Sequence, residues 1–464
     1  MPQQTITHDV FFRPEQTGTY ALLPIDLPGG TVRLDVQYSY SHRIGAEPQF
    51  QGGNTLDLGL FDERGIAFLE AGFRGWSGSE RDSFYITSKH ATPGYLAGPL
   101  NPGRWNVMLG LYKLAPEGCQ AKLTIVITTD QSQPADPAGA RSITGLPSSI
   151  VKPAFAPWLR GDMHCHTWHS DGELSPAELV ALARRRGLDF LAITDHNTTS
   201  SQRELASLTD PGLILVRGIE ITSFRGHFNA WGSSEWVDFR IENPEMMAAA
   251  LQHARTCSRA LTACNHPKPD GPAWEYPEVA GYDCIEVWNG PWEDLNQAAL
   301  DFWLGQLARG RRIPAVGGSD FHNRAGDGTG IARLPGNPTI WVYTPSAPGE
   351  ANILQAVRRG HVAISETPAG PLLELRAGTS LPALGGDSLP RPDDEIDMRV
   401  RCLKGKGYWL RLLDERGVLF ERKIRAADET VSTGLPVTSS LYLRAELRDA
   451  NGSMKALTNP VYLD

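Results

Sequence analysis

Short apolar strands alternate with helical segments from about residue 158 to residue 368, and this alternation most limits the folds open to the chain. Apolar segments such as LDFLAITDH and IPAVGGSD read as strands. Between them, Ser175-Pro176-Ala177-Glu178 combines an N-cap serine, a proline at the first helical position and a glutamate at the third, and Asn243-Pro244 repeats the cap and proline. This pattern predicts a mainly parallel sheet with helices, with enough strands to close an α/β barrel.

The segments on either side have a different pattern. Residues 1–130 contain apolar/polar alternation in TVRLDVQYSY and AKLTIVITTD, which predicts an antiparallel β-sandwich. Alternation returns in EIDMRVRCL and LYLRAELRD, so residues 371–464 are predicted to form a second small β-sandwich. We therefore expect an N-terminal β-domain (1–130), a proline-rich linker (131–157), a central α/β domain (158–370) and a C-terminal β-domain (371–464).

Residues that can carry chemistry gather at the ends of the central strands. The groups are His164-Cys165-His166 with Asp171, then Asp195-His196, Glu220, His227, Asn265-His266 and Asp320-Phe321-His322. In an α/β barrel the carboxyl ends of the strands converge on one face, so these groups are expected to share one site. The two imidazoles of a His-x-His segment point to the same side of an extended chain, which suits chelation.

Six histidines and three carboxylates in one small space predict a metal centre. Divalent ions bind neutral imidazole and anionic carboxylate, and so relieve the repulsion among such groups. The nitrogen and oxygen donors, without thiolate, favour Zn²⁺, Mn²⁺ or Fe²⁺. More than four ligands implies at least two ions, and Glu220 is the candidate for a bridging carboxylate.

The strings DMHCHTWHSDG, LAITDHN, GIEIT, NHP and GGSDFH stand in the order of the metal motifs of the PHP (polymerase and histidinol phosphatase) superfamily, which the chain resembles. GHFNAWG, IEVWNGP and the terminal ALTNPVYL, with the flanking β-domains, look most like its carbaryl-hydrolase-like branch. The resemblance implies a distorted (β/α)7 TIM-like barrel, flanked by the two β-sandwiches, that holds two or three divalent metal ions (Zn, Mn or Fe).

The same resemblance implies a set of ligands for each ion. The first ion would be held by His164, His166, Glu220 and Asp320, and the second by Asp171, His196 and Glu220, with His322 as a further candidate. His227 and His266 would serve a third ion or contact an anionic group of the substrate. The chain departs from the superfamily pattern at Gly172, where members with a clear third site have histidine, so that Asp171 must supply the ligand.

Further residues have weaker signals. His266 and His322 are candidates to protonate a leaving group as well as to bind metal. Asp162 and Asp195 adjoin ligands and are expected to fix imidazole tautomers, with loop capping as the alternative role. His169 points away from the ligand pattern and is left out of the site. The candidates for substrate binding are Arg225, Lys268 and Arg324 for a phosphate group, and Trp288 for stacking, with packing as its alternative role.

The pattern and the resemblance together favour a metal-dependent phosphoesterase that hydrolyses a small phosphate mono- or diester through a metal-activated water. A carboxylic-ester or carbamate hydrolase is the first alternative, and a 5′-to-3′ exonuclease is the second. The formal charge of −9 disfavours long polyanions as substrates. No apolar run approaches the roughly 20 residues of a membrane span. The scattered cysteines and the absence of a signal-like start favour the cytoplasm, and the β-domains could mediate homo-oligomer formation.

Overall fold

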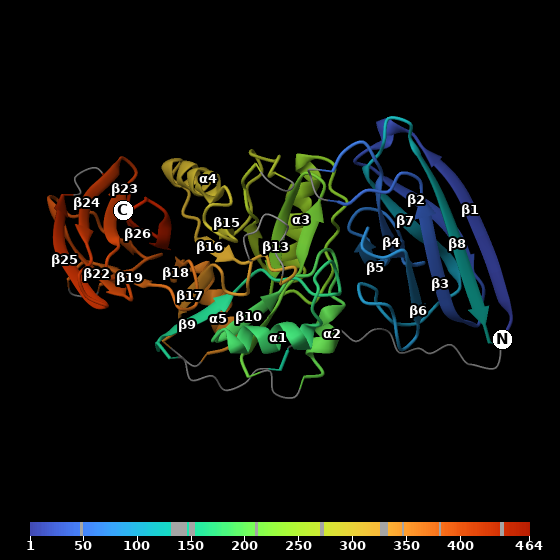
Figure 1. The fold of residues 1–464 in the computed structure, drawn as a ribbon, viewed down its shortest axis with the longest axis horizontal. Coiled ribbons are helices and arrows are strands. Elements are labelled where there is room, and N and C mark those ends of the chain that lie inside the picture. The colour runs from blue at the N-terminus through green and yellow to red at the C-terminus, as the bar shows by residue number, and fades with distance from the viewer. Residues whose placement is uncertain are drawn as a thin grey trace.

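The computed structural model describes residues 1–46, 50–130, 146–147, 154–208, 212–269, 273–324, 333–345, 348–379, 382–436 and 440–464. The expected linker at 131–157 lies mostly outside these ranges. The molecule is mostly β-structure with few helices, and its N-terminal, central and C-terminal parts follow one another along the long axis (Figure 1).

Residues 3–129 form two antiparallel four-stranded sheets packed face to face. The first has the order β1 (Gln3–Phe12), β8 (Cys119–Thr129), β3 (Thr31–Tyr40), β6 (Ser83–Thr87). The second has the order β2 (Tyr20–Leu27), β7 (Gly103–Lys113), β4 (Thr55–Phe61), β5 (Phe73–Gly78). A short 3₁₀ helix, η1, spans Pro14–Gln16. This arrangement is the antiparallel sandwich that the alternating pattern predicts.

Strand β4 is buried on both of its faces, because its sheet packs on two different cores. Leu56, Leu58 and Leu60 belong to the core of the sandwich. Phe61, on the opposite face, belongs to the large core of the central domain, as does Met108 of β7. The N-terminal sandwich is therefore packed against the central domain through a sheet face, rather than attached by a linker alone.

The central domain contains two sheets and five helices among its described residues. One sheet comprises β11 (Ile214–Arg217), β10 (Phe190–Ile193), β9 (Trp158–Asp162), β17 (Thr339–Tyr343) and β18 (Val362–Ser365). The other comprises β12 (Glu220–Ser223), β13 (Gly226–Trp231), β14 (Leu261–Cys264), β15 (Cys284–Asn289) and β16 (Ala315–Gly318). The helices are α1 (Pro176–Arg185), α2 (Ser201–Leu205), α3 (Pro244–Thr256), α4 (Asn296–Ala308) and α5 (Glu350–Arg358).

The expected closed (β/α)7 barrel is not confirmed by the strand pairing of the described residues. Between the two sheets the structure has isolated bridges, which pair Cys165 with Phe321 and His196 with Glu220, and no continuous ladder among the described strands. The regular parallel pattern is interrupted because β12 and β13 form an antiparallel hairpin, and β17 runs antiparallel to β9. Both bridges lie at or beside the candidate metal ligands, so the site sits where the two sheets meet.

Two of the expected helix starts are confirmed. The Ser175 hydroxyl accepts a hydrogen bond from the Glu178 backbone N–H, and the Glu178 carboxylate accepts one from the Ser175 backbone, which completes a capping box. The Asn243 side chain caps α3 through the Met246 N–H at 2.9 Å. In the part of the chain that the structure describes, no helix is long and apolar enough to cross a membrane.

The C-terminal strands form two layers around a third core. The outer sheet has the order β20 (Ala383–Leu384), β19 (Leu372–Ala377), β22 (Glu395–Leu403), β25 (Asp428–Pro436). The other strands are β21 (Ser388–Leu389), β23 (Trp409–Asp414), β24 (Gly417–Lys423), β26 (Tyr442–Arg448), β27 (Met454–Thr458) and β28 (Val461–Leu463). Because β27 pairs with β18, the first central sheet continues into this region without a break.

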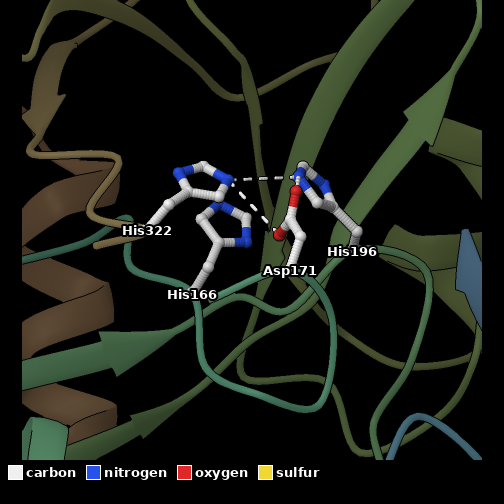
Figure 2. A group of neighbouring side chains, drawn as sticks. All are labelled: His166, Asp171, His196 and His322. Atoms are coloured by element: carbon white, nitrogen blue, oxygen red, sulfur yellow. Dashed lines mark hydrogen bonds and ion pairs between the residues drawn. The ribbon is translucent and has the colours of Figure 1, made fainter. Parts of the chain in front are cut away.

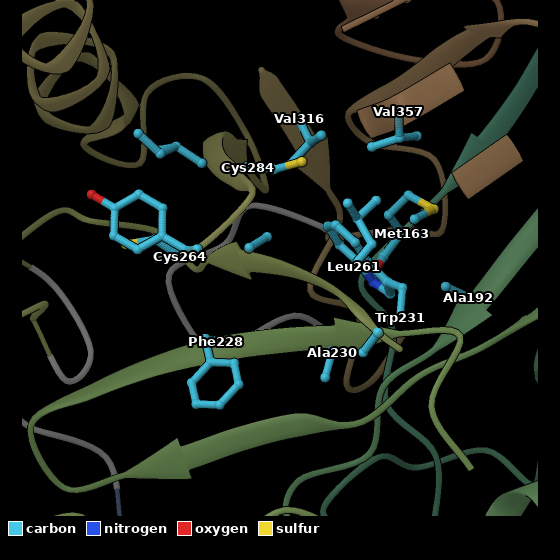
Figure 3. Close-up of a cluster of buried hydrophobic side chains, with 14 of the residues drawn as sticks. Met163, Ala192, Phe228, Ala230, Trp231, Leu261, Cys264, Cys284, Val316 and Val357 are labelled. Atoms are coloured by element: carbon cyan, nitrogen blue, oxygen red, sulfur yellow. The ribbon is translucent and has the colours of Figure 1, made fainter. Parts of the chain in front are cut away.

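The largest core lies beneath the site and connects its strands (Figure 3). Trp231 of β13 is 1% exposed, and its indole N–H donates a hydrogen bond of 2.8 Å to the carbonyl of Met163. Leu261 of β14 and Val316 of β16 complete the apolar layer around them. This packing fixes the segment that leads directly into His164.

Candidate metal centre

All nine ligand candidates of the sequence analysis lie together where the central strands end. They fall into three groups whose donor atoms lie within 4.8 Å of one another: His166 with Asp171, His196 and His322; His164 with His166 and Asp320; and Glu220 with His227 and His266. These residues follow β9, β10, β14 and β16 or lie in the β12–β13 hairpin, so separate elements build the site. The sequence prediction that these residues share one site is therefore supported by the geometry.

Figure 2 shows the first group, in which the side chains of His322, Asp171 and His196 are in contact. The Nε2 atom of His322 lies 3.4 Å from Asp171 Oδ1 and 3.5 Å from His196 Nε2. The same His196 nitrogen lies 3.5 Å from Asp171 Oδ2. The Asp171 and His322 side chains are 32% and 27% exposed, whereas His166 of the same group is fully buried. Asp171 and His322 are thus the members of the group that solvent can reach.

Glu220 joins the groups because its two carboxylate oxygens face different histidines. Its Oε2 lies 2.7 Å from His196 Nδ1 and 3.4 Å from His164 Nε2. Its Oε1 lies 3.2 Å from His227 Nδ1 and 3.5 Å from His266 Nε2. The buried Glu220 carboxylate therefore contacts at least one imidazole of each of the three groups.

The acids and imidazoles shift the pKa of one another strongly. Burial alone would raise the pKa of Glu220, but His164, His196 and His227 hold it well below its ordinary value. Burial, with the neighbouring His322 and His196, lowers the pKa of His166 to about 4. Glu220 is therefore anionic and His166 neutral at ordinary pH, as metal ligands are. Burial opposes the charged form of His164 and His196, but the neighbouring carboxylates raise the pKa of both imidazoles well above the ordinary value, so these two groups would release a proton on binding a metal.

Several buried polar atoms of the site have no hydrogen-bond partner, and they indicate whether these residues could bind a metal ion. Among the described residues, one buried ring nitrogen each of His164, His166 and His227 has no hydrogen-bond partner. Buried polar atoms are normally paired, so three such atoms in one cluster need a partner of another kind. Divalent cations fit this donor set of imidazole nitrogen and carboxylate oxygen.

Two polar residues orient the candidate ligands: Glu286, which sequence analysis missed, and Asn265, which stands beside His266 in one of the predicted groups. Glu286 of β15 accepts a hydrogen bond from His164 Nδ1 at 2.9 Å, which leaves Nε2 directed into the centre. The Asn265 amide donates to Glu220 Oε1 at 2.7 Å. Glu286 is 122 residues from His164. Its one sequence signal is an acidic residue inside the apolar strand IEVWN.

Replacing Glu286 by glutamine is expected to weaken metal binding about 10- to 100-fold, because the charge that orients His164 is lost. Titration of chelator-treated protein with Zn²⁺ or Mn²⁺ in a calorimeter measures this change. Glu275→Gln is the matched control, since Glu275 is a half-exposed acid paired with Arg225. Equal metal affinities for the Glu286→Gln variant and the wild type would contradict this role.

Asp162 and Asp195 form hydrogen bonds with the loops that carry the ligands, rather than with the imidazole rings. Asp162 accepts hydrogen bonds from the backbone N–H groups of His164, Ser319 and Gly336. Asp195 accepts from the backbone and hydroxyl of Thr167. These contacts match the loop-capping alternative, and they explain how two distant segments of the centre are held together.

Backbone geometry explains the glycine at position 172. A Cβ atom there would lie 2.5 Å from the carbonyl carbon of His166, so no side chain can be accommodated without moving that ligand. Asp320 and His266 have left-handed backbone conformations with φ of 54° and 28°. Such conformations are unfavourable for residues other than glycine and concentrate at functional sites.

The four candidates for substrate binding differ in solvent exposure and in their contacts. Arg225 is half-exposed and paired with Glu275, and Arg324 is exposed. Trp288 is 1% exposed and packs edge-on against Trp292, which favours its alternative packing role. Lys268 is buried and bonds Asp294, and burial lowers the pKa of its ammonium group.

Arg333, which sequence analysis missed, is the cation in contact with a candidate ligand. Its Nη1 lies 3.4 Å from Asp320 Oδ2 and donates to the Asn289 side chain at 2.9 Å. His169, left out of the predicted site, bonds Ser200 and Glu204 on the wall of a separate cavity of about 800 Å³. Sequence reasoning could not find Arg333 because no motif surrounds it.

Comparison with known proteins identifies part of this region. Residues 162–255 match the family model described as the PHP domain. The 5′-3′ exoribonuclease of Haemophilus influenzae is 42% identical over 64 residues, which are 13% of this chain and 23% of that protein. The 3′,5′-nucleoside bisphosphate phosphatase of Chromobacterium violaceum is 27% identical over 126 residues, which are 23% of this chain and 44% of that protein. The chain thus spans less than half of each relative.

A solved structure from Bacteroides vulgatus is described as a two-domain protein containing a predicted PHP-like metal-dependent phosphoesterase. It is 18% identical, and the match covers 70% of this chain and 100% of that chain, with a TM-score of 0.37 that is too low to carry an argument. The PHP domain match ends before His266, Asp320 and His322. These three residues belong to the centre through their position in the cluster.

Proposed function

We propose that this chain, whose residues 162–255 match a PHP domain, is a metal-dependent phosphoesterase that acts on a small phosphate mono- or diester. The observation that carries the proposal is the convergence of six imidazoles and two further carboxylates on the buried Glu220, with buried imidazole nitrogens that have no hydrogen-bond partner. The similarity to a nucleoside bisphosphate phosphatase supports the same class of reaction.

Two or three divalent ions, Zn, Mn or Fe, would occupy the centre. His164, His166, Asp320 and Glu220 would hold the first ion, and Asp171, His196, His322 and Glu220 the second. His227 and His266, with Glu220, form the group that would hold a third. The ions would supply an activated water and Lewis-acid stabilisation of the phosphoryl oxygens.

His322 is the better placed of the two candidates for protonation of the leaving group. Its side chain is 27% exposed, whereas that of His266 is 7% exposed. The Nδ1 of His322 is held 2.9 Å from the carbonyl of Asp320, which leaves Nε2 on the outer side of the centre beside Asp171. In this role the Nε2 of His322 would carry a proton to the departing alkoxide instead of binding the second ion.

Lys268 and Arg333 are the cations that we propose to meet the negative charge of the substrate. Both contact Asp294, and Arg333 also contacts Asp320 of the centre. A fixed pair of cations beside the ligands would favour a substrate with an anionic group. Arg225 and Arg324 remain candidates only for more distant contacts.

The two alternatives keep the same centre and change the substrate. The resemblance to the carbaryl-hydrolase-like branch favours an ester or carbamate carbonyl. The similarity to exoribonucleases over a short region favours the 5′ end of a nucleic acid. The formal charge of −9 opposes binding of a long polyanion but not of a single nucleotide.

A substrate panel separates these three functions. We expect one metal-quantified preparation, supplied with Mn²⁺ or Zn²⁺, to hydrolyse p-nitrophenyl phosphate or bis-p-nitrophenyl phosphate faster than p-nitrophenyl acetate. A chelator should abolish this activity and added metal should restore it. Faster hydrolysis of the acetate would indicate a carboxylic-ester or carbamate hydrolase. Faster hydrolysis of a 5′-phosphorylated oligonucleotide would indicate a 5′-to-3′ exonuclease.

A further inference from the structure

The tip of the β12–β13 hairpin inserts an aromatic ring into the N-terminal sandwich. Phe224 lies at this tip, between Glu220–Ser223 and Gly226–Trp231. Its ring stacks on Tyr20 at 5.0 Å with an angle of 10° between the planes, and on Tyr112 at 5.4 Å with an angle of 27°. Both tyrosines belong to the sheet whose face covers the central domain. Stacked aromatic pairs of this kind stabilise a contact beyond the apolar area that they bury.

A glycine provides the space for this ring. Tyr20 and Asp57 both pair with Gly110 in the sheet register, so Gly110 lies between their side chains. A Cβ atom on Gly110 would lie 3.3 Å from the Phe224 ring and 3.0 Å from Asp57 Oδ2. The missing side chain therefore leaves a hollow in the sheet face, and Phe224 fills it.

The same hairpin carries two of the candidate ligands. Glu220 begins β12 and His227 lies in β13, and both belong to the group completed by His266. The sandwich also contacts the centre at a second place, where Trp76 of β5 packs edge-on against His196 at 6.3 Å. In addition, the Ser200 hydroxyl accepts a hydrogen bond from the Gly94 backbone at 3.1 Å.

We infer that the N-terminal β-sandwich is a positioning part of the metal centre. Phe224, held over Gly110 by Tyr20 and Tyr112, fixes the hairpin so that Glu220 and His227 can share an ion with His266. Strand β12, of four residues, lies at the edge of its sheet and has only β13 as its partner strand among the described elements, so the contact of Phe224 with the sandwich helps to hold the hairpin tip. This inference rests on the proposed metal centre and adds that a separate domain sets its affinity.

Replacing Phe224 by alanine is expected to weaken binding of one ion at least about tenfold and to lower the metal content by about one ion per chain after dialysis. In Gly110→Val the new side chain would occupy the hollow from the sandwich and displace the Phe224 ring, so we expect the same effect. Metal content by mass spectrometry and the visible absorption of the Co²⁺-loaded protein are the readouts. Phe11→Ala is the control, because Phe11 is 54% exposed on β1 of the sandwich.

The outcomes separate this inference from the proposed function. A wild-type protein that binds no divalent ion would overturn both. A wild-type protein that binds ions, with variants that keep its stoichiometry, affinity and Co²⁺ spectrum, would overturn the positioning role alone. If Phe224→Ala fails to fold, the smaller changes Phe224→Leu and Gly110→Ala give the same comparison, and unchanged metal binding in both would likewise overturn it.

Discussion

Replacing Glu220 by glutamine is expected to remove metal binding and hydrolysis together. Glu220 is fully buried, and each of its oxygens lies within 3.5 Å of imidazole nitrogens on two sides. A neutral amide cannot balance these ligands or bridge two ions. Loss of one partner of a buried ionic group costs about 3–5 kcal/mol, which corresponds to roughly 150- to 5,000-fold in affinity.

Metal content and turnover of p-nitrophenyl phosphate should be measured on the same preparation of this variant. Glu235→Gln is a suitable control, because Glu235 is exposed and is not one of the candidate ligands. Wild-type metal content in the Glu220→Gln variant would show that the bridge is wrongly assigned. Full metal content with lost turnover would instead give Glu220 a role in the reaction itself.

The candidate ligands could be predicted because each lies in a short motif at a strand end. His164 and His166 share a His-x-His segment, and Asp320 and His322 share GGSDFH. Glu286 and Arg333 could not be found in this way, since their contacts with His164 and Asp320 depend on how distant segments meet. A local pattern identifies donor atoms, but only the fold shows which residues orient them.

The alternation of apolar and polar residues predicts the flanking sandwiches, but it does not predict how they pack against the central domain. Period-two patterns identify a strand with two faces, but Phe61 and Met108 are buried against a second core, which alternation within the sandwich cannot reveal. The continuous pairing of β18 with β27 is equally hidden, because it joins residues about 90 positions apart. The expected parallel barrel is interrupted where β12 and β13 form an antiparallel hairpin. The sequences GIEIT and GHFNAWG do not show whether the two strands run parallel or antiparallel.

Asp57 provides a test of the interface between sandwich and metal centre. It lies on the face of β4 that also carries Phe61, it is 8% exposed, and no hydrogen bond or ion pair of its carboxylate is found among the described residues. Burial raises its pKa from 3.8 to about 7, although the nearby His196 acts in the opposite direction. An ionised carboxylate at this position is unfavourable, because nothing replaces its lost hydration.

Replacing Asp57 by asparagine is therefore expected to stabilise the metal-free protein at pH 8 relative to the wild type. With a raised pKa, the folded wild type binds more protons than the unfolded chain between about pH 4 and pH 7, so its stability falls as the pH rises through this range. At about 1.4 kcal/mol for each pH unit, the variant should gain about 3 kcal/mol on the wild type between pH 5 and pH 8.

Urea unfolding of chelator-treated wild type and Asp57→Asn at pH 5 and pH 8 measures this gain. The chelator matters because bound cations near His196 would favour the ionised carboxylate and reduce the difference. Asp26→Asn is the control, since the Asp26 side chain is 75% exposed and should show little pH-dependent gain. If the free energy of unfolding changes equally with pH in the wild type and in Asp57→Asn, the prediction is wrong. The Asp57 carboxyl would then have a partner that compensates its burial.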